Sequence, residues 1–363
     1  MKKSLIYLTL AGAFTLASCT NLEEDIFGVV PQKGFGNTPE QLAALLGPAY
    51  SNVRACAWNW HNQEVTTDVM MVPTRGRDWY DGGNWLNYHR HTWSNLLSQN
   101  NDMWGWIFEG GINTVNQLIP QVEGNTSAIA ELRAIRAYYY FLALDWYGNV
   151  PILTETQNNV TTRPRAEVYA FVEKELTEIL PNLTEDKVYG RINRWVAQSL
   201  LAKLYLNAQV YKGTPEYDKA IAAADAVIGS GKYSLESNFF SNFAVANQSS
   251  NENIWAIPFD KNLAGEMTIQ MRTLHYQNQL TYGLAAQPWN GFCSLADFYN
   301  TFDNSDLRKQ MFIVGVQRSA SGAILKDDNG NDLVFTINVP DDEMTAAEPT
   351  FQGAGARLGK YEI

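Results

Sequence analysis

The 363-residue sequence is poor in the residues that build metal sites and disulfide frameworks. It contains three cysteines and four histidines, and no spacing of these two residue types matches a zinc site. His89 and His91 could share one side of a strand, but no cysteine or third histidine lies near them. In an exported protein Cys56 and Cys293 could pair, or both could be buried free thiols. The sequence therefore predicts no metal and no cofactor.

Basic residues and catalytic motifs are also scarce. The chain has 27 Lys and Arg against 38 Asp and Glu, a formal net charge of -11, which argues against a nucleic-acid partner because a polyanion needs a basic surface. It contains no G-x-S-x-G turn, no P-loop and no dinucleotide fingerprint. These absences predict a protein that is not an enzyme and does not bind nucleic acid.

The only long apolar run lies at the amino terminus. Two lysines precede an apolar stretch from Leu5 to Ala17, which is too short to span a bilayer, and a lipobox-like LASC run ends at Cys19. The alternative is an ordinary secretory signal that ends in a chance cysteine. We predict a lipoprotein signal peptide at 1–18 and a tether at 19–35, with acyl chains on Cys19 anchoring the protein to a membrane.

The segment 36–230 has the apolar periodicity of helices. Thr38 and Gln41 form a predicted capping box at the first helix. Helices are predicted at 38–53, within 101–122, across 131–147, at 166–180 after a loop through Arg165, at 191–211 and at 217–228. The last two have the length of a tetratricopeptide hairpin, with a generic helical bundle as the alternative. The fold class is therefore predicted to be mainly α, with tetratricopeptide-like hairpins.

The remaining segment, 231–363, loses the helical period and gains aromatic, Gly, Asn and Asp residues. Its clearest pattern is a small hairpin, in which the turn 327–330 joins the apolar triplets 323–325 and 333–335. We predict that this part consists mainly of loops.

Seven of the eleven tryptophans fall between Trp58 and Trp106. Glycines and polar residues in 73–85 break both the helix and the strand period, so this segment is predicted to be a loop with exposed rings. A sugar presents an apolar C–H face and a rim of hydroxyls, which suit aromatic platforms flanked by polar groups. The predicted glycan-binding residues of this loop are Arg75, Asp78, Trp79, Asn84 and Trp85.

A second patch repeats the combination of ring, amide and turn. It contributes Tyr282, Trp289 and Asn290, which could complete a platform with Trp79 or Trp85. The alternatives are that the rings fold inward, that Arg75 or Arg77 braces the loop through carbonyl groups, and that Asn290 only makes a turn. The other five tryptophans of the rich segment are predicted to lie in the core, and these are Trp58, Trp60, Trp93, Trp104 and Trp106.

Two other functions remain open at this point. A glycoside hydrolase would need two carboxylates across a cleft, for which Asp68, Asp78 and Asp81 are candidates. A protein-binding adaptor would use the helical repeats and would give exposed tryptophans no special role.

The stretch 131–151, ELRAIRAYYYFLALDWYGNVP, resembles the RAxxYFxLxxxYGxVP signature of the SusD/RagB family. A later run from Asp297 to Arg308 resembles that family's DFYxxFxxxDxR segment. The resemblance implies a lipid-anchored glycan-binding protein on the outer-membrane surface of Bacteroidetes, which delivers its ligand to a TonB-dependent, SusC-like transporter. It also implies a further helix of the form RYAEVLLxYAEA. No such helix is found here, so the chain is expected to lack the family's C-terminal part.

Overall fold

The computed structural model describes residues 35–363 except 60, 77, 156–159, 266 and 341–351. The predicted signal peptide, Cys19 and almost all of the tether lie outside the described residues. The chain divides into two units, 1–44 and 45–363, of which the first is described only from residue 35. In the first unit the predicted capping box is confirmed. The backbone N–H of Gln41 donates to Thr38 Oγ1 at 3.3 Å, and the backbone N–H of Thr38 donates to Gln41 Oε1 at 3.4 Å.

Helices make up most of the regular structure before residue 230. The helices up to residue 122 are α2 (Pro39–Val53), α3 (Cys56–Asn59), α4 (His61–Glu64), α5 (Asn84–His89), α6 (Ser98–Trp104) and α7 (Asn113–Leu118), with a π-helical segment η2 (Gly105–Ile112) between the last two. They are followed by α8 (Thr126–Trp146), α9 (Arg165–Ile179), α10 (Arg194–Leu206), α11 (Ala208–Lys212) and α12 (Tyr217–Gly229). The predicted helices are confirmed, although α8 begins before Glu131 and the predicted helix 191–211 is divided into α10 and α11.

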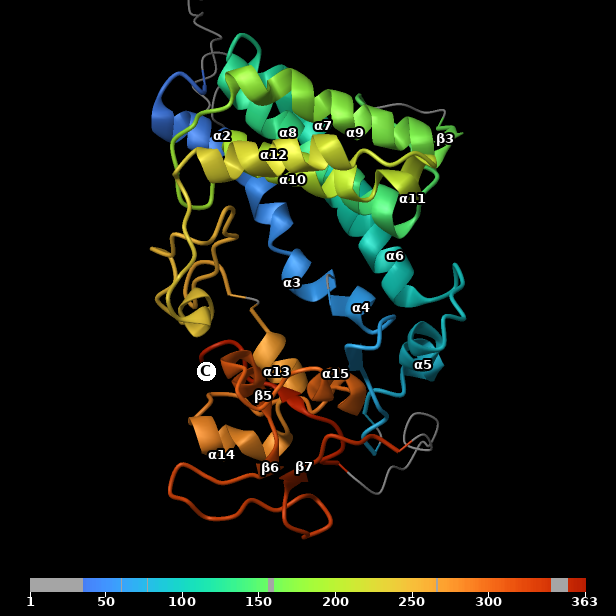
Figure 1. Ribbon diagram of the computed structural model, residues 1–363, viewed down its shortest axis with the longest axis vertical. Coiled ribbons are helices and arrows are strands. Elements are labelled where there is room, and N and C mark those ends of the chain that lie inside the picture. Colours follow the sequence, from blue (N-terminus) through green and yellow to red (C-terminus); the bar gives the residue numbers. More distant parts are fainter. Residues whose placement is uncertain (1–34, 60, 77, 156–159, 266, 341–351) are drawn as a thin grey trace, which may run out of the picture. The chain divides into compact units, whose positions relative to one another are not determined.

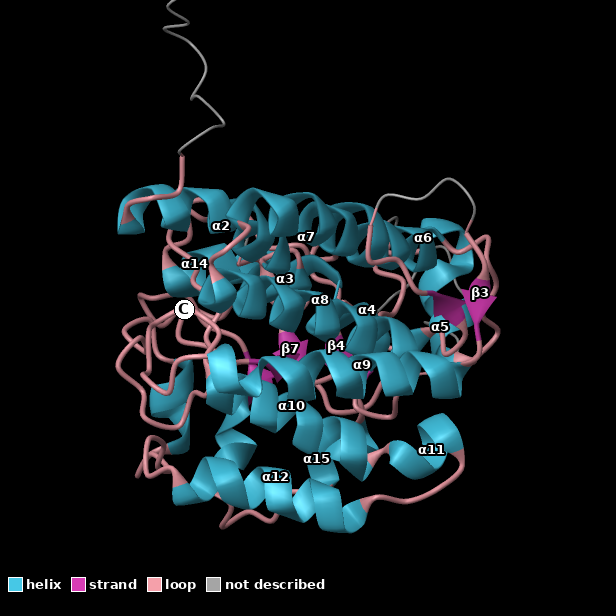
Figure 2. Cartoon of the chain, turned by 90° about the horizontal axis from the view of Figure 1, so that it is seen from above, coloured by secondary structure: helices cyan, strands magenta, loops and turns pink. Residues whose placement is uncertain are grey.

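The long helices pair into hairpins. α8 packs against α9 and α10 packs against α12, and Figures 1 and 2 both show these four helices running alongside one another. Asn125 caps α8 by accepting a hydrogen bond from the Ala128 amide at 3.0 Å. At the other end, Gly148 adopts a left-handed φ of 76° and its amide donates to the Ala143 carbonyl at 3.2 Å, which ends the helix.

A buried ion pair fixes α8 to α9. Arg136 donates from Nε and Nη2 to Glu175 Oε2 at 2.9 and 2.7 Å, and Arg133 donates from Nη2 to Glu175 Oε1 at 2.7 Å. Glu175 and Arg136 are both buried. The arginines of the signature therefore hold the first hairpin together.

Close packing against α8 accounts for Gly111, the second of the two consecutive glycines in the predicted helix 101–122. A Cβ atom on Gly111 would lie 2.6 Å from the ring of Tyr139, which is fully buried on α8. Glycine at this position lets η2 approach α8 closely.

Short elements dominate after residue 230. The helices are α13 (Ile269–Thr273), α14 (Gln279–Tyr282) and α15 (Ala296–Asn300). The described strands are β1 (Met70–Met71), β2 (Val150–Pro151), β3 (Thr162–Arg163), β4 (Cys293–Ser294), β5 (Phe312–Ile313), β6 (Gly315–Val316), β7 (Val334–Phe335) and β8 (Arg357–Leu358). They form antiparallel pairs β1–β4, β2–β3, β5–β8 and β6–β7.

The predicted small hairpin is confirmed. Its two arms are joined by an antiparallel backbone β-bridge between Lys326 and Asp332 and by the Leu333 amide, which donates to the Leu325 carbonyl at 2.8 Å. The 327–330 turn closes with Gly330 at φ 82°.

The alternative of two free thiols also holds, since Cys56 and Cys293 are both buried and unpaired. Within the described ranges, no helix has the length and apolar character needed to cross a membrane.

Candidate functional site

The predicted loop 73–85 is packed more tightly than its sequence suggests. Trp85 is only 6% exposed and belongs to a hydrophobic cluster with Tyr88 and Phe292. Its Nε1 donates to Asp81 Oδ2 at 2.7 Å. The expectation that Trp85 is an exposed binding ring is therefore wrong, because the ring fills the core beneath the loop and Asp81 satisfies its one polar group.

Arg75 and Asn290 are also buried, within what we call the Gln352 network (Arg75, His275, Asn290, Gln352 and Arg357). The Gln352 carbonyl accepts hydrogen bonds from Arg75 Nη1 at 3.2 Å, Arg357 Nη2 at 2.8 Å and Asn290 Nδ2 at 3.3 Å. The structure therefore corrects the prediction that the side chains of Arg75 and Asn290 face a ligand. Arg75 braces backbone carbonyls instead, which was the alternative.

The pKa of His275 provides a test of whether the Gln352 network is buried. His275 Nε2 pairs with Gln352 Oε1 at 3.0 Å, and Nδ1 accepts from the Gln277 amide at 3.1 Å. Burial, together with the charges of Arg357 and Arg75, lowers the pKa of His275 to about 4, although the hydrogen bond to Gln352 and the charge of Asp328 act in the opposite direction. The neutral ring is therefore the form that the folded protein stabilises.

Between about pH 6.5 and about pH 4 the unfolded chain binds a proton at His275 that the folded chain does not. We therefore expect acidification across this range to cost up to about 1.4 kcal/mol of unfolding free energy per pH unit from this residue. The His275→Gln variant, compared with the parent by denaturation at a series of pH values, should have a shallower slope. Equal slopes would contradict this assignment.

The two predicted aromatic loops do meet. Trp79 Nε1 donates to the Trp289 carbonyl at 2.7 Å, and a Cβ atom on Gly291 would lie 2.5 Å from the Trp79 ring. Trp79 has a left-handed φ of 65° and Asn290 one of 54°, so both turns adopt conformations that non-glycine residues seldom adopt. Trp79 and Trp289 are each half-buried.

Asp78 and Tyr276 extend this contact. The carboxylate of Asp78 is exposed and accepts a hydrogen bond from the Tyr276 hydroxyl. Tyr276 begins the 3-10 helix η6 (Tyr276–Asn278), which lies between α13 and α14. Asp78 is thus held at the surface beside the packed Trp79.

Trp58 completes the exposed part of the site, although its sequence context predicted a core position. Its ring is 52% exposed and stands edge-on to Trp289 with centroids 6.3 Å apart. The other three residues of α3 are buried, so this short helix presents one ring to solvent. No periodicity in the sequence distinguishes it from its buried neighbours. We call Trp58, Asp78, Trp79, Tyr276 and Trp289 the aromatic surface.

A buried arginine supports the Trp58 ring. The guanidinium carbon of Arg272 lies 3.8 Å from the Trp58 ring centroid, and Nη1 donates to the Trp58 carbonyl at 3.2 Å. Nη1 also lies 3.0 Å from His61 Nδ1. Burial lowers the pKa of Arg272 to about 9. Burial and the nearby charge of Arg272 together lower the pKa of His61 to about 3. This cation–π contact fixes the orientation of the exposed ring.

Two predicted residues lie apart from these contacts. Asn84 Nδ2 donates to Ser98 Oγ at 3.2 Å, and Tyr282 is half-buried at the end of α14. Among the described residues, no hydrogen bond or ring contact joins either side chain to Trp289. Arg77 and Trp60 lie outside the described residues.

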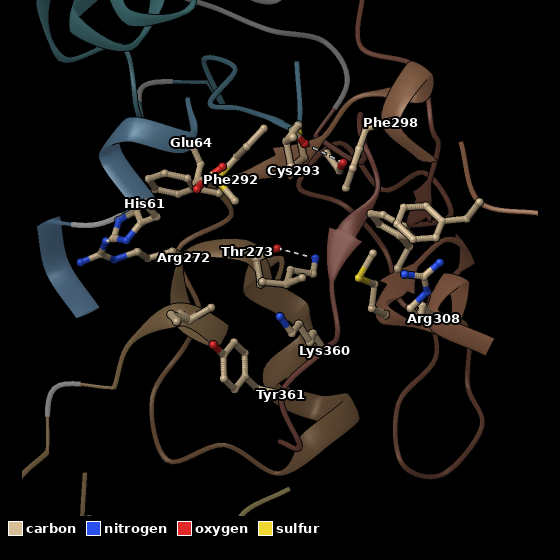
Figure 3. Close-up of a pocket in the computed structure, with 18 of the residues that line it drawn as sticks. His61, Glu64, Arg272, Thr273, Phe292, Cys293, Phe298, Arg308, Lys360 and Tyr361 are labelled. Carbon is tan, nitrogen blue, oxygen red and sulfur yellow. Dashed lines mark hydrogen bonds between the residues drawn. The ribbon is translucent and has the colours of Figure 1, made fainter. Parts of the chain in front are cut away.

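An apolar cavity of about 400 Å³ is lined by Arg272, which supports the Trp58 ring, and by His61. Figure 3 shows Phe292 and Cys293 in its wall, and Thr273 Oγ1 accepting a hydrogen bond from the Leu358 amide at 2.8 Å. Phe292 also contacts Trp79 with centroids 5.4 Å apart. The same ring therefore lines the cavity and supports the site. In the described part of the chain, no three His, Cys, Asp or Glu side chains are grouped to hold a metal ion.

These features define a helical-hairpin scaffold that carries a surface of aromatic and polar side chains. Residues 24–206, half of the chain, match the SusD-like_3 family model, described as "Starch-binding associating with outer membrane". The chain belongs to this SusD-like family. The predicted tetratricopeptide-like helical fold class and the resemblance to SusD/RagB proteins are both confirmed.

The relatives agree with this assignment. The chain is 30% identical to the starch-binding protein SusD of Bacteroides thetaiotaomicron over 237 residues, or 63% of this chain and 41% of that protein. It is 26% identical to a SusD-like protein of Bacteroides ovatus over 327 residues, or 84% of this chain and 58% of that one. A SusD superfamily protein from Parabacteroides distasonis has the same fold, with a TM-score of 0.69 at 18% identity over 89% of this chain and 69% of that one. The chain thus spans about half the length of the curated relatives.

Proposed function

We propose that this protein binds a polysaccharide or oligosaccharide on its aromatic surface. The observation that carries the proposal is the exposed Trp58 ring, which is fixed from behind by Arg272 and set edge-on to Trp289. Such a ring offers a flat apolar face to the C–H groups of a pyranose. The exposed carboxylate of Asp78 can accept hydrogen bonds from sugar hydroxyls at the edge of this surface.

The proposed activity is binding and not hydrolysis. Of the carboxylates considered for a hydrolase, Asp78 accepts from the Tyr276 hydroxyl and Asp81 from Trp85 Nε1. These contacts suit residues that anchor aromatic side chains, whereas a hydrolase needs one carboxyl group kept protonated as an acid and a second one placed across the sugar. The name of the relative SusD, a starch-binding protein, supports the same choice.

The cellular setting belongs to the same proposal. The family description links its members to the outer membrane, and the lipobox that ends at Cys19 would supply a lipid anchor on the cell surface. We propose that the bound glycan passes to a SusC-like, TonB-dependent transporter. Tyr217, Ile221 and Ile228 are exposed on α12, and such apolar side chains would suit a protein partner of this kind or the partner of an adaptor.

Replacing Trp58 or Trp289 with alanine should weaken glycan binding by about tenfold or more, because each change removes part of the stacking surface. Affinity electrophoresis across starch, host-glycan and plant-polymer panels would first identify the ligand, and calorimetric titration would then compare the variants. Tyr217→Ala is the matched control, since it removes a ring of similar exposure, 53%, from α12.

The parent and the control should bind alike. Retention of full affinity by both tryptophan variants would refute the aromatic surface as the binding site. Release of reducing sugar by the purified protein would instead support the hydrolase.

A further inference from the structure

A second cavity shares none of the five residues of the aromatic surface, although Glu64 lines both this cavity and the apolar one. It encloses about 530 Å³ and is bounded by α4, α5, α6, the end of α8 and the loop that carries Trp93. This volume falls within the range of about 300–1,000 Å³ that is typical of small-molecule sites. We call it the Trp93 cavity.

Trp93 gives this cavity an exposed platform, although its sequence context predicted a core position. Its ring is 56% exposed and is backed by the ring of His91, with centroids 5.3 Å apart and an interplanar angle of 35°. His91 has a left-handed φ of 57°, and its Nε2 lies 2.6 Å from the Thr66 carbonyl. The loop therefore holds one broad aromatic face toward solvent at the cavity edge.

More aromatic side chains form the opposite walls. Tyr88, Trp146 and Tyr147 all line the cavity. The two tyrosine hydroxyls are already engaged, because Tyr88 Oη donates to Asn100 Oδ1 at 2.6 Å and Tyr147 Oη donates to the Asn100 carbonyl at 2.8 Å. These contacts leave rigid rings that face the cavity.

The polar groups that remain for a ligand are mostly acceptors. Glu64 and Asp145 contribute carboxylates and Gln63 an amide. Asp145 Oδ1 accepts from the Tyr211 hydroxyl at 2.6 Å, which leaves Oδ2 for another donor. The described residues that line the cavity include no lysine, arginine or histidine.

We propose that the Trp93 cavity is a second saccharide site, selective for a sugar unit that carries a free ammonium group. The Trp93 face takes the C–H face of the ring, and the aromatic walls and two carboxylates attract the positive charge. A neutral sugar would leave both carboxylates without a cationic partner, whereas a phosphate or uronate would meet only like charge. This proposal does not depend on glycan binding at the aromatic surface.

The test uses β-1,4-linked glucosamine tetrasaccharide and its fully N-acetylated counterpart, titrated at mildly acidic pH where the free amine is charged. The parent should bind the amine form about tenfold more tightly. Trp93→Ala should weaken binding of both by about tenfold, whereas the double change Glu64→Gln with Asp145→Asn should remove only the preference for the amine. Both carboxamides keep the shape of the carboxylates they replace.

Three control variants test whether this binding belongs to the Trp93 cavity. Asp225→Asn removes one carboxylate from the exposed face of α12 and should change nothing, which would exclude a general attraction of the acidic chain for a polycation. Tyr217→Ala should also be silent. Trp58→Ala should leave binding of the amine form intact.

Equal affinity for the two oligosaccharides, or unchanged binding in Trp93→Ala, would overturn the proposal. Loss of amine binding in Trp58→Ala would also overturn it, by moving that binding to the aromatic surface. If Trp58→Ala abolishes binding of a neutral glycan while Trp93→Ala has no effect on either oligosaccharide, only the second site is refuted and the proposed function stands.

Discussion

Glu175→Gln should destabilise the protein by about 3–5 kcal/mol, because it leaves a buried guanidinium without its counter-charge. Arg136 directs both Nε and Nη2 at Glu175 Oε2, and the side chains of both residues are only 6% exposed. Asn116 Oδ1 accepts from Arg136 Nη1 at 2.8 Å, but this amide carries no negative charge. The free energy of unfolding from chemical denaturation measures the loss.

Glu178→Gln is the matched control on the same helix. Glu178 also pairs with Arg133 at 2.7 Å, yet its side chain is 46% exposed, so its removal should cost far less stability than the loss of Glu175. Combining Glu175→Leu with Arg136→Met should recover much of the stability that Glu175→Leu alone removes, because an apolar pair needs no charge compensation. Similar losses for Glu175→Gln and Glu178→Gln would contradict the importance of burial.

The helical part of the fold could be predicted from the sequence because its signals are local. The period of 131–147 marks a buried face, and the left-handed Gly148 marks its end. These signals lie within a few residues of the structure they specify. The arginine partner could not be predicted, since Glu175 lies on another helix and is one of several carboxylates in α9.

The aromatic residues show where local signals are insufficient. Trp58 and Trp93 were predicted to be buried and are more than half exposed, whereas Trp85 was predicted to be exposed and is 6% exposed. The outcomes for Trp58 and Trp85 depend on distant parts of the chain. Phe292 covers Trp85 and Arg272 supports Trp58 from behind, and neither pairing leaves a pattern in a short window of sequence.

The convergence of the two loops was predicted more successfully than the roles of their residues. Trp79 and Trp289 do come together, but they do so through a hydrogen bond from one ring to the other residue's carbonyl. Arg75 and Asn290 were chosen as polar groups for a sugar rim, and both are used to satisfy buried carbonyl and side-chain groups of the Gln352 network. Polar residues in a turn can serve its internal hydrogen bonds as readily as a ligand.

Arg357→Leu should reduce both stability and glycan binding, because this arginine connects β8 to the turn that carries Trp289. It is fully buried. Its Nη2 donates to Asn290 Oδ1 at 2.9 Å and to the Gln352 carbonyl at 2.8 Å, and its Nη1 donates to the Phe292 carbonyl at 3.4 Å. Leucine would leave these buried acceptors short of donors, at an expected cost of about 3 kcal/mol.

Arg308→Leu is the matched control in the same loop-rich part of the chain. Arg308 pairs with Asp306 at 2.6 Å, and its side chain is 56% exposed, so its loss should change the unfolding free energy far less than the loss of Arg357. The loss of unfolding free energy in Arg357→Lys should lie between those of Arg357→Leu and Arg308→Leu. One ammonium group cannot reproduce the hydrogen bonds of a planar guanidinium group to three acceptors. Denaturation and glycan titration of the three variants would be compared at one temperature.

The two measurements together distinguish a local role of Arg357 from a general one. If the Gln352 network positions Trp289, Arg357→Leu should weaken glycan binding at temperatures where the variant is still folded, and the Trp93 cavity should keep its affinity for the amine oligosaccharide. Loss of binding at both sites in parallel would mean that the variant is simply unfolded. Unchanged binding at the aromatic surface, despite lower stability, would show that the network supports the fold without setting the geometry of the site.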